Sequence, residues 1–349
     1  IAAGAMTGVS SATKSASDPT ITTNPSTGLG TKWINTTSGE IFILTDATAG
    51  ENVWTSTGGT SGDVDPYTHA MGKTYSYQSG GTSSNNVITK FSFASHGTPT
   101  DVGDLTVGRH SLAGSSSSTH GYSQGGYNSK VTIDKFSFSA DGNAVDHGDL
   151  FTAHWVGAGA SSVTHGYAIG GVSTGDTIQK YAFASNTTGT DVGNLTVGAR
   201  RLCGAAISAT HGHALGGQSS ASDNIDKFAF ASDGDSTDFG TLSGSDRKPS
   251  ATNSKDYGYA CGGTNILDTI EKFSFASGGA VSDVGDLVDG RADGPAGTSS
   301  TTHGYIAGGN SGSHYFGIDQ HPFASDSGGT DVGTMSAGRD PQEMAGQQV

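Results

Sequence analysis

Histidines at one recurring position are the first residues whose type and spacing could do chemistry. They are His120, His165, His211 and His303. Four imidazoles at equivalent places around an axis could hold a metal ion, since the imidazole nitrogen is a common metal ligand. Tyr75 and Tyr257 stand at the same position elsewhere in the chain, and tyrosine supplies no imidazole. The sequence therefore favours packing or hydrogen bonding as the role of this position.

Lysines and arginines recur in the same way. The lysines are Lys90, Lys135, Lys180, Lys227 and Lys272, with Gln320 in the sixth place. The arginines are Arg109, Arg201, Arg247, Arg291 and Arg339, with His154 in one unit. We expect each lysine to contact a carboxylate of an adjacent turn, at ~0–1 kcal/mol when exposed, and each arginine to brace a turn. A ring of lysines that binds a ligand is the alternative.

Acidic loops raise the question of calcium. One loop carries Asp141, Asn143, Asp146 and Asp149, and another carries Asp233, Asp235 and Asp238. Oxygen ligands at short spacing suit Ca²⁺, but neither loop has the D-x-D-x-D-G pattern that ends in Glu. Solvated carboxylates that start Asx turns are the favoured interpretation. Calcium at the first loop remains the alternative, and no other cofactor is expected.

The last repeating unit departs furthest from the others. It concentrates aromatic and imidazole groups in His314, Tyr315, Phe316 and His321. Because aromatic faces can stack on sugars, we predict a recognition patch here. Packing at a seam of the fold is the alternative.

The sequence contains no HExxH, GxSxG, P-loop or dinucleotide-binding motif. Two carboxylates around a pocket, as glycosidases use, leave no local pattern. We therefore expect a protein that is not an enzyme, with a carbohydrate-active enzyme (a depolymerase or a lyase) as the alternative.

All of these residues belong to a repeat of 45 or 46 residues. Its clearest mark is a glycine pair, whose second members are Gly81, Gly126, Gly171, Gly217, Gly263 and Gly309. A segment such as ITKFSFAS follows each pair, beginning at Ile88, Ile133, Ile178, Ile225, Ile270 and Ile318. A segment such as DVGDL comes next, beginning at Asp101, Asp146, Asp191, Asp238, Asp283 and Asp331. Each unit therefore contains four short strand-like runs separated by Gly, Ser, Asn and Asp, which is typical of a four-stranded antiparallel blade.

Side-chain alternation indicates how such blades pack. In one strand Tyr181 and Phe183 point to one face while Ile178 and Lys180 point to the other, so both faces must be covered. Blades packed around an axis cover both. We expect an all-β protein in which residues 66–349 form a six-bladed β-propeller.

Composition and charge agree with this fold class. The chain has 56 glycines among 349 residues and only 14% charged residues, which excludes a helix bundle because glycine costs a helix about 1 kcal/mol relative to alanine. The formal net charge of −15 argues against nucleic acid as a partner. No run of 18 apolar residues occurs, so we expect no membrane insertion.

The order of these motifs resembles a kelch-type β-propeller repeat: Arg, aromatic-x-x-Gly-Gly, Ile-x-Lys-Phe and hydrophobic-Gly-x-Leu. The resemblance covers residues 75–349 but lacks the late Trp of a kelch repeat. The runs THGYxxGG, IDKFSFAS and DVGDLTVGR are also similar to repeats of tailed-bacteriophage virion proteins, often tail fibres. The stretch GTKWINTTSGEIFILTDATAGENVWTS resembles a small module near the start of such proteins.

Two further segments precede the repeats. Residues 1–31 lack any strand or helix period, so we predict an extended arm or linker. Residues 32–59 alternate apolar and polar side chains in three runs, which predicts a small three-stranded β-meander. The first repeat lacks its first strand, and we expect the C-terminal segment 338–349 to supply it and close the ring. The competing candidate is the segment 66–74.

The resemblance implies a virion structural protein, as a tail fibre or a receptor-binding component on the outside of the particle. Its arm and β module would attach to other virion proteins, and the propeller would meet a host-surface glycan or protein. A homo-oligomer is expected, and a capsid decoration or collar protein is the alternative.

Overall fold

The computed structural model describes residues 12–48, 52–57, 64, 71–81, 85–128, 130–172, 175–198, 200–217, 223–244, 249–292, 295–310, 315–335 and 345–348. Over these residues the protein is all-β, and none of them forms a helix that could span a membrane. The strands make seven small sheets. The chain divides into two compact units, Ile1–Thr68 and His69–Val349.

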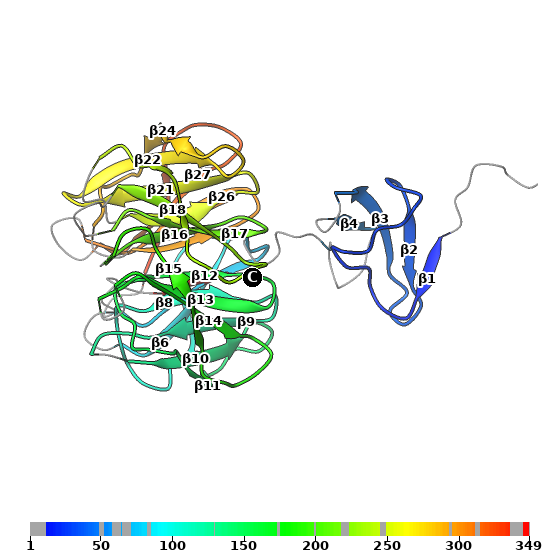
Figure 1. Ribbon diagram of the computed structural model, residues 1–349, viewed down its shortest axis with the longest axis horizontal. Coiled ribbons are helices and arrows are strands. Elements are labelled where there is room, and N and C mark those ends of the chain that lie inside the picture. Colours follow the sequence, from blue (N-terminus) through cyan, green and yellow to red (C-terminus); the bar gives the residue numbers. More distant parts are fainter. Residues whose placement is uncertain are drawn as a thin grey trace, which may run out of the picture. The chain divides into compact units, whose positions relative to one another are not determined.

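The N-terminal unit contains one sheet in the order β1-β2-β3-β4 (Figure 1). Its strands are β1 (Thr13–Ser15), β2 (Lys32–Asn35), β3 (Ile41–Asp46) and β4 (Val53–Ser56). The sheet has four strands rather than the predicted three, because β1 pairs with β2 in parallel. Residues 12–31 thus differ from the predicted extended arm, and residues 1–11 lie outside the described part of the chain.

A small apolar core and one buried amide hold this sheet. Phe42, Leu44 and Trp54 are fully buried, and Trp33 packs edge-on against Trp54. The Asn52 amide donates to the carbonyls of Ile21 and Thr23. The Asn52 side chain therefore holds the segment around Ile21 and Thr23, which precedes β2, against the sheet.

The second unit contains six sheets, numbered here in chain order. Sheet 1 is β5 (Tyr75–Ser79), β6 (Val87–Ser92), β7 (Thr100–Asp104) and β29 (Ala345–Gln348). Sheet 2 is β8 (Ala113–Ser116), β9 (His120–Gln124), β10 (Thr132–Ser137) and β11 (Val145–Asp149). Sheet 3 is β12 (Ala158–Ser161), β13 (His165–Ile169), β14 (Thr177–Ala182) and β15 (Thr190–Asn194).

The remaining sheets follow the same plan. Sheet 4 is β16 (Gly204–Ile207), β17 (His211–Leu215), β18 (Asn224–Ala229) and β19 (Thr237–Thr241). Sheet 5 is β20 (Ser250–Asn253), β21 (Tyr257–Gly263), β22 (Leu267–Ser274) and β24 (Ser282–Asp286). Sheet 6 is β25 (Ala296–Ser299), β26 (His303–Ala307), β27 (Gly317–Pro322) and β28 (Thr330–Thr334). A short strand, β23 (Gly279–Ala280), lies in the β22–β24 turn and pairs in parallel with β19.

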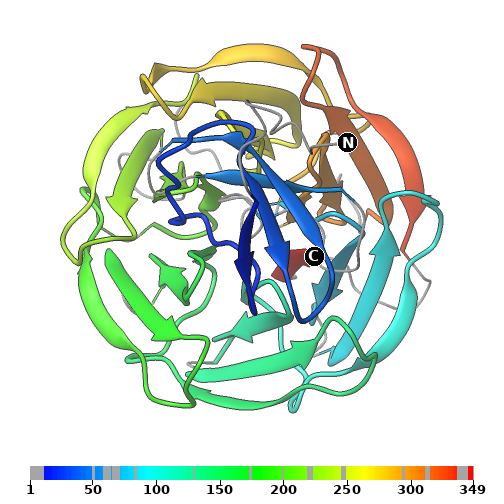
Figure 2. The ribbon, with the colours of Figure 1, turned by 90° about the vertical axis from the view of Figure 1, so that its right-hand side faces the viewer.

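The six sheets follow one another in a ring, which gives a β-propeller-like fold (Figure 2). Their first strands contact each other in the order β8, β12, β16, β20, β25, β29 and back to β8. In sheet 1 this place is taken by β29, which pairs with β5 in antiparallel register. Of the two candidate closing segments, 66–74 contributes no named strand within its described residues 71–74.

One aromatic contact recurs at every junction between neighbouring sheets. The aromatic residue of the THGY segment packs against the second aromatic of the next sheet's Phe-x-Phe segment, with ring centroids 4.5–5.1 Å apart. The pairs are Tyr77–Phe138, Tyr122–Phe183, Tyr167–Phe230, His213–Phe275, Tyr259–Phe323 and Tyr305–Phe93. Because aromatic side chains bury large areas, these pairs supply much of the core of a chain that is poor in apolar residues.

Glycines at two places let the sheets approach closely. In the first strands, a Cβ at Gly159 would lie 2.1 Å from the carbonyl oxygen of Gly114 in the next strand of the ring. In the DVGDL segments, a Cβ at Gly103 would lie 2.2 Å from the carbonyl oxygen of Gly142 in the turn of the next sheet. Both glycines are therefore required by contact with a neighbouring backbone.

Candidate binding surface

The ring has two ends with different loops. The turns between first and second strands and between third and fourth strands lie at one end, which we call the hairpin face. The loops after the glycine pairs and the connections between sheets lie at the other, the connection face. This division follows from the antiparallel order of each sheet.

On the hairpin face, lysines of alternate sheets pair with a carboxylate of the next sheet. The pairs are Lys90–Asp141 at 3.0 Å, Lys180–Asp233, and Lys272–Asp326 at 2.5 Å. The expected contact to a neighbouring turn is confirmed for these three lysines. Lys135 and Lys227 make no ion pair among the described residues, and they lie near the rings of Tyr122 and Phe239.

The recurring histidines also lie on this face. His120, His165, His211 and His303 are half-buried, and Nδ1 of each lies 2.8–2.9 Å from the hydroxyl of the preceding threonine. Burial lowers the pKa of all four imidazoles. Within the described ranges, no three His, Cys, Asp or Glu side chains come together as a metal site. The structure thus shows a hydrogen bond to threonine and partial burial at this position.

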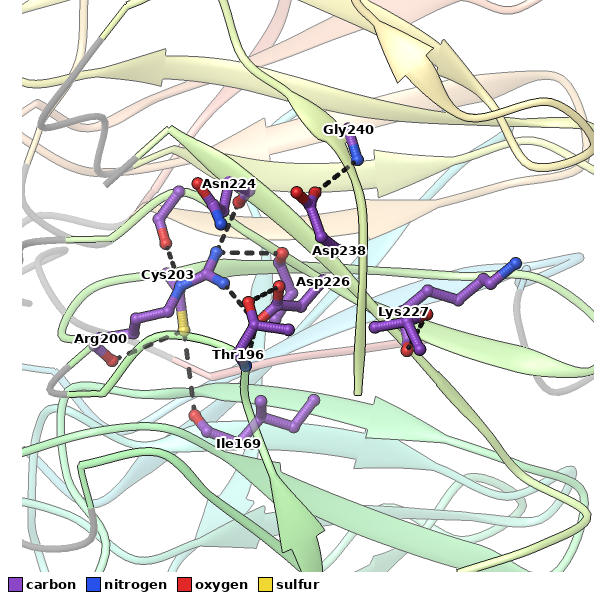
Figure 3. A network of polar contacts seen from close by, with 12 residues as sticks. Ile169, Thr196, Arg200, Cys203, Asn224, Asp226, Lys227, Asp238 and Gly240 are labelled. Carbon is purple, nitrogen blue, oxygen red and sulfur yellow. Dashed lines mark hydrogen bonds and ion pairs between the residues drawn. The ribbon is translucent and has the colours of Figure 1, made fainter. Parts of the chain in front are cut away.

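Buried ion pairs connect neighbouring sheets on the connection side (Figure 3). Arg200 and Asp226 are both fully buried and lie 2.9 Å apart. Asp226 also accepts hydrogen bonds from the backbone N–H and the hydroxyl of Thr196, which follows the outer strand of sheet 3. Arg200 donates to the carbonyls of Ala214, Gly216 and Asn224. The pair therefore fastens the connection from sheet 3 onto sheet 4.

The same pair recurs as Arg109–Asp134 at 3.1 Å and Arg291–Asp319 at 2.6 Å. The predicted register is wrong at one arginine, because Arg200 rather than Arg201 occupies the buried position, and Arg201 is exposed. Arg247 and Arg339 lie outside the described residues. His154 replaces the arginine in sheet 3, where burial lowers its pKa to about 4.

The proposed calcium ligands have separate partners. Asp141 pairs with Lys90, the amide oxygen of Asn143 accepts from the N–H of Asp104, and Asp146 accepts from the N–H of Gly148. Asp149 lies in strand β11. The Asp146 contact is an Asx turn that recurs in the other five DVGDL-type segments. These contacts support the structural interpretation of the acidic loop, and the calcium prediction rests on the sequence alone.

The structure separates the residues of the predicted recognition patch. His321 is buried, takes the place of the repeat's first Phe and lies 2.9 Å from the Thr252 hydroxyl. It is therefore a core residue and does not belong to a surface patch. Tyr315 packs over the Arg291 guanidinium at 4.3 Å, and Phe316 packs against the core between sheets 6 and 1. His314 lies outside the described residues.

A cavity of about 110 Å³ opens on the ring axis. Small residues of the first strands line it, together with Leu112, Val156, Leu202, Pro249 and Pro295 of the connections. Val156 and Leu202 have left-handed backbones, with φ of 58° and 52°. The N–H of Val156 donates to Ser111 and the N–H of Leu202 donates to Val156. A left-handed valine is strained, so this rim is held by its hydrogen bonds to neighbouring sheets.

An aromatic cluster that the sequence analysis missed lies beside this cavity. The Tyr127 ring stacks on His110 at 4.7 Å and meets Trp155 edge-on at 5.0 Å. Tyr127 is 50% exposed. His110 and Trp155 directly precede Ser111 and Val156, which line the cavity. The cluster and the cavity mouth therefore form one surface on the connection face, which we call the aromatic surface.

The contacts of the repeat explain why these three rings meet. Tyr127 follows a glycine pair, and its N–H donates to the carbonyl of His110 in the connection into its own sheet. Trp155 occupies the place of His110 in the next sheet. The corresponding residues after the other glycine pairs include Val172, Thr264 and Asn310, so an aromatic here departs from the repeat. That departure is the signal in the sequence that could have identified the surface.

Comparison with known proteins adds no assignment. Neither a protein-family model nor a curated protein matches the chain.

Proposed function

We propose that the second unit is a six-bladed, kelch-type β-propeller and that the protein is a structural component of a tailed-bacteriophage virion. In this proposal the propeller acts as a tail-fibre or receptor-binding part that attaches to a glycan of the host surface. The motif resemblance and the ring of six sheets support it. The N-terminal unit would join the protein to other virion subunits.

The observation that carries the binding role is the aromatic surface. A half-exposed tyrosine, held by a stacked histidine and an edge-on tryptophan, offers a fixed flat ring that can stack on the apolar face of a sugar. Tyrosine and tryptophan are also the residues that most often dominate binding energy at interfaces. The cavity of about 110 Å³ next to it gives room for a neighbouring sugar substituent.

The distribution of polar contacts supports a binding role as well. Lysine–aspartate, arginine–aspartate and histidine–threonine contacts recur from sheet to sheet and hold the ring together. The aromatic surface has no such repeat, so its residues serve another purpose than closing the ring.

A glycan array with the purified full-length chain tests this proposal. We expect Tyr127→Ala and Trp155→Ala to weaken binding at least about tenfold, in line with loss of an aromatic anchor. Tyr257→Ala is the matched control, because Tyr257 is a partly exposed aromatic on the hairpin face. Equal loss in all three variants would contradict the proposal. Analysis of the bound glycans for shorter products separates an adhesin from a depolymerase, since only the enzyme releases them.

A further inference from the structure

The junctions between sheets on the hairpin face alternate in charge. Six residues after the recurring Lys or Gln, sheets 2, 4 and 6 have an aspartate: Asp141, Asp233 and Asp326. Sheets 1, 3 and 5 have His96, Asn186 and Gly278 in that place. Each aspartate pairs with the lysine of the preceding sheet. Every second junction therefore contains an ion pair, and the junctions between them lack the carboxylate.

The junction between sheets 2 and 3 gathers cationic and imidazole groups around one buried ring. The Tyr122 centroid lies 5.9 Å from Lys135 Nζ, 6.5 Å from the His120 ring and 5.2 Å from the His147 ring. His147 is buried and its Nε2 lies 3.0 Å from the carbonyl oxygen of Ala182. His120 is half-buried, and Lys135 lies close enough to contribute to lowering its pKa. The Lys135 ammonium thus lies over the buried Tyr122 ring, and the two imidazoles lie beside that ring.

The opposite side of this junction leaves the ammonium without its usual partner. Asn186 stands where the two neighbouring junctions have Asp141 and Asp233, and its amide donates to the carbonyl of Asp146. The Asp146 carboxylate accepts from the N–H of Gly148. Lys135 therefore has no ion-pair partner among the described residues, although Lys180 at the same position of sheet 3 has one.

We propose that this junction binds the carboxylate of an acidic sugar residue in a sparsely charged polysaccharide. The ligand carboxylate takes the place that aspartate fills at the neighbouring junctions and accepts from the Lys135 ammonium. His120, whose Nδ1 lies 2.8 Å from the Thr119 hydroxyl, is the second polar group near this position. Hydrogen bonds between ionised partners are the strongest of their kind.

The net charge of the chain favours one class of anionic ligand over others. A net charge of −15 repels densely charged polymers such as nucleic acid or an acidic peptide tail. A polysaccharide with one carboxylate for every two or more sugars brings a single charge to each junction. The junction between sheets 4 and 5 again combines a lysine and a histidine, Lys227 and His211, with no aspartate, because Gly278 stands in that position. The rings beside them differ, since His213 and Phe239 replace Tyr122 and His147. Two such lysine positions, two sheets apart in the ring, could each bind one carboxylate of a repeating polymer.

Binding of hyaluronan oligosaccharides, measured by calorimetry at low salt, tests the site. The double variant Lys135→Ala/Lys227→Ala should weaken binding about tenfold or more, as expected for loss of a charged hydrogen bond. Asn186→Asp in the Lys227→Ala background should have the same effect, because the new carboxylate occupies Lys135 without removing any group. Lys180→Ala is the matched control and should change affinity less than twofold. Asp233→Asn frees Lys180 and should strengthen binding.

Three results would overturn the proposal. They are absence of hyaluronan binding by the natural chain, equal loss in Lys180→Ala, and unchanged affinity in the Asn186→Asp variant. Preferential binding of poly-glutamate would assign the site to an acidic peptide instead. The proposal is independent of the aromatic surface, so neutral glycans that depend on Tyr127 should bind the lysine variants as they bind the natural chain. Thermal midpoints check that every variant is folded.

Discussion

Two regions of the ring differ in how closely they follow the repeat: the sheet-to-sheet junctions keep it, and the aromatic surface departs from it. At the junctions, one set of contacts returns from sheet to sheet: the stacked aromatic pair, the close glycines and the ion pairs. On the aromatic surface, Tyr127 and Trp155 stand where other sheets have unrelated residues. Repeated residues thus maintain the scaffold, and under the proposed function the departures at Tyr127 and Trp155 mark the place where a partner would be recognised.

The strongest test of this contrast removes a buried charge from a junction. Asp226→Ala leaves Arg200 uncompensated in the interior, which should cost about 3–5 kcal/mol of the free energy of unfolding. In thermal unfolding this is a fall of about 10 °C for a unit of this size. Asp238→Ala removes only an exposed Asx turn in the same region and should shift the midpoint far less. A similar shift in both variants would contradict the assigned role of the buried pair.

Close packing of the first strands predicts the next largest effect. Gly159→Ala places a Cβ against the carbonyl oxygen of Gly114, and overpacking of this kind costs about 1–3 kcal/mol. Ala205→Gly is the reverse change at the corresponding position of sheet 4, which already holds an alanine. Denaturant unfolding should show a clear decrease in the free energy of unfolding for Gly159→Ala and a smaller decrease for Ala205→Gly. A neutral Gly159→Ala would mean that the strands can separate without cost.

Buried histidines at the junctions predict a dependence on pH. Burial lowers the pKa of His213 and His321 to about 3. Below about pH 6.5 each of these histidines binds a proton in the unfolded chain but stays neutral in the folded chain. The free energy of unfolding therefore has its full value above this pH. It falls by about 1.4 kcal/mol per pH unit for each histidine as the pH decreases toward 3. The drop should be visible in thermal midpoints between pH 7 and 5.

Replacing these two histidines by the aromatic residues found at the same positions of other sheets tests whether they cause the dependence on pH. His213→Tyr and His321→Phe should each make the midpoint less sensitive to acid, because neither new side chain gains a proton in this range. If the two junction variants lost stability with acid as steeply as the natural chain, the buried imidazoles would not be its cause.

The smallest expected effect on stability belongs to the aromatic surface itself. Tyr127→Ala removes a half-exposed ring, and surface substitutions of this kind usually change stability by about 0.5 kcal/mol or less. Its glycan binding should nevertheless be the most impaired of all these variants. A large fall in the thermal midpoint would show that Tyr127 serves the scaffold, and the contrast between the two regions would be lost.

The sequence predicted the scaffold well because strand faces alternate with a period of two. Tyr181 and Phe183 share a face and pack on Tyr122 of sheet 2, as their spacing indicates. It failed where local pattern carries no information. In the run GARRL, two adjacent arginines made the register ambiguous, and packing selected Arg200.

Three other features could not be predicted from the sequence, because they depend on contacts between distant segments. The strand Thr13–Ser15 has no apolar side chain, and it forms because its backbone pairs with β2 from a distance in sequence. The residue type of His321 suggests a surface role, whereas its position in the repeat is that of a buried Phe. The aromatic surface arises from loops of two sheets and has no contiguous motif. In each case tertiary contacts decide the outcome.

The pairing of β29 with β5 has a consequence for how the ring forms. The two strands come from opposite ends of the repeat region, and loop closure over such a distance is slow. During synthesis on the ribosome, β5 therefore keeps an unpaired edge until β29 has been made. Until then this edge can pair with a strand of another chain, and the arrival of β29 removes that possibility by completing the ring.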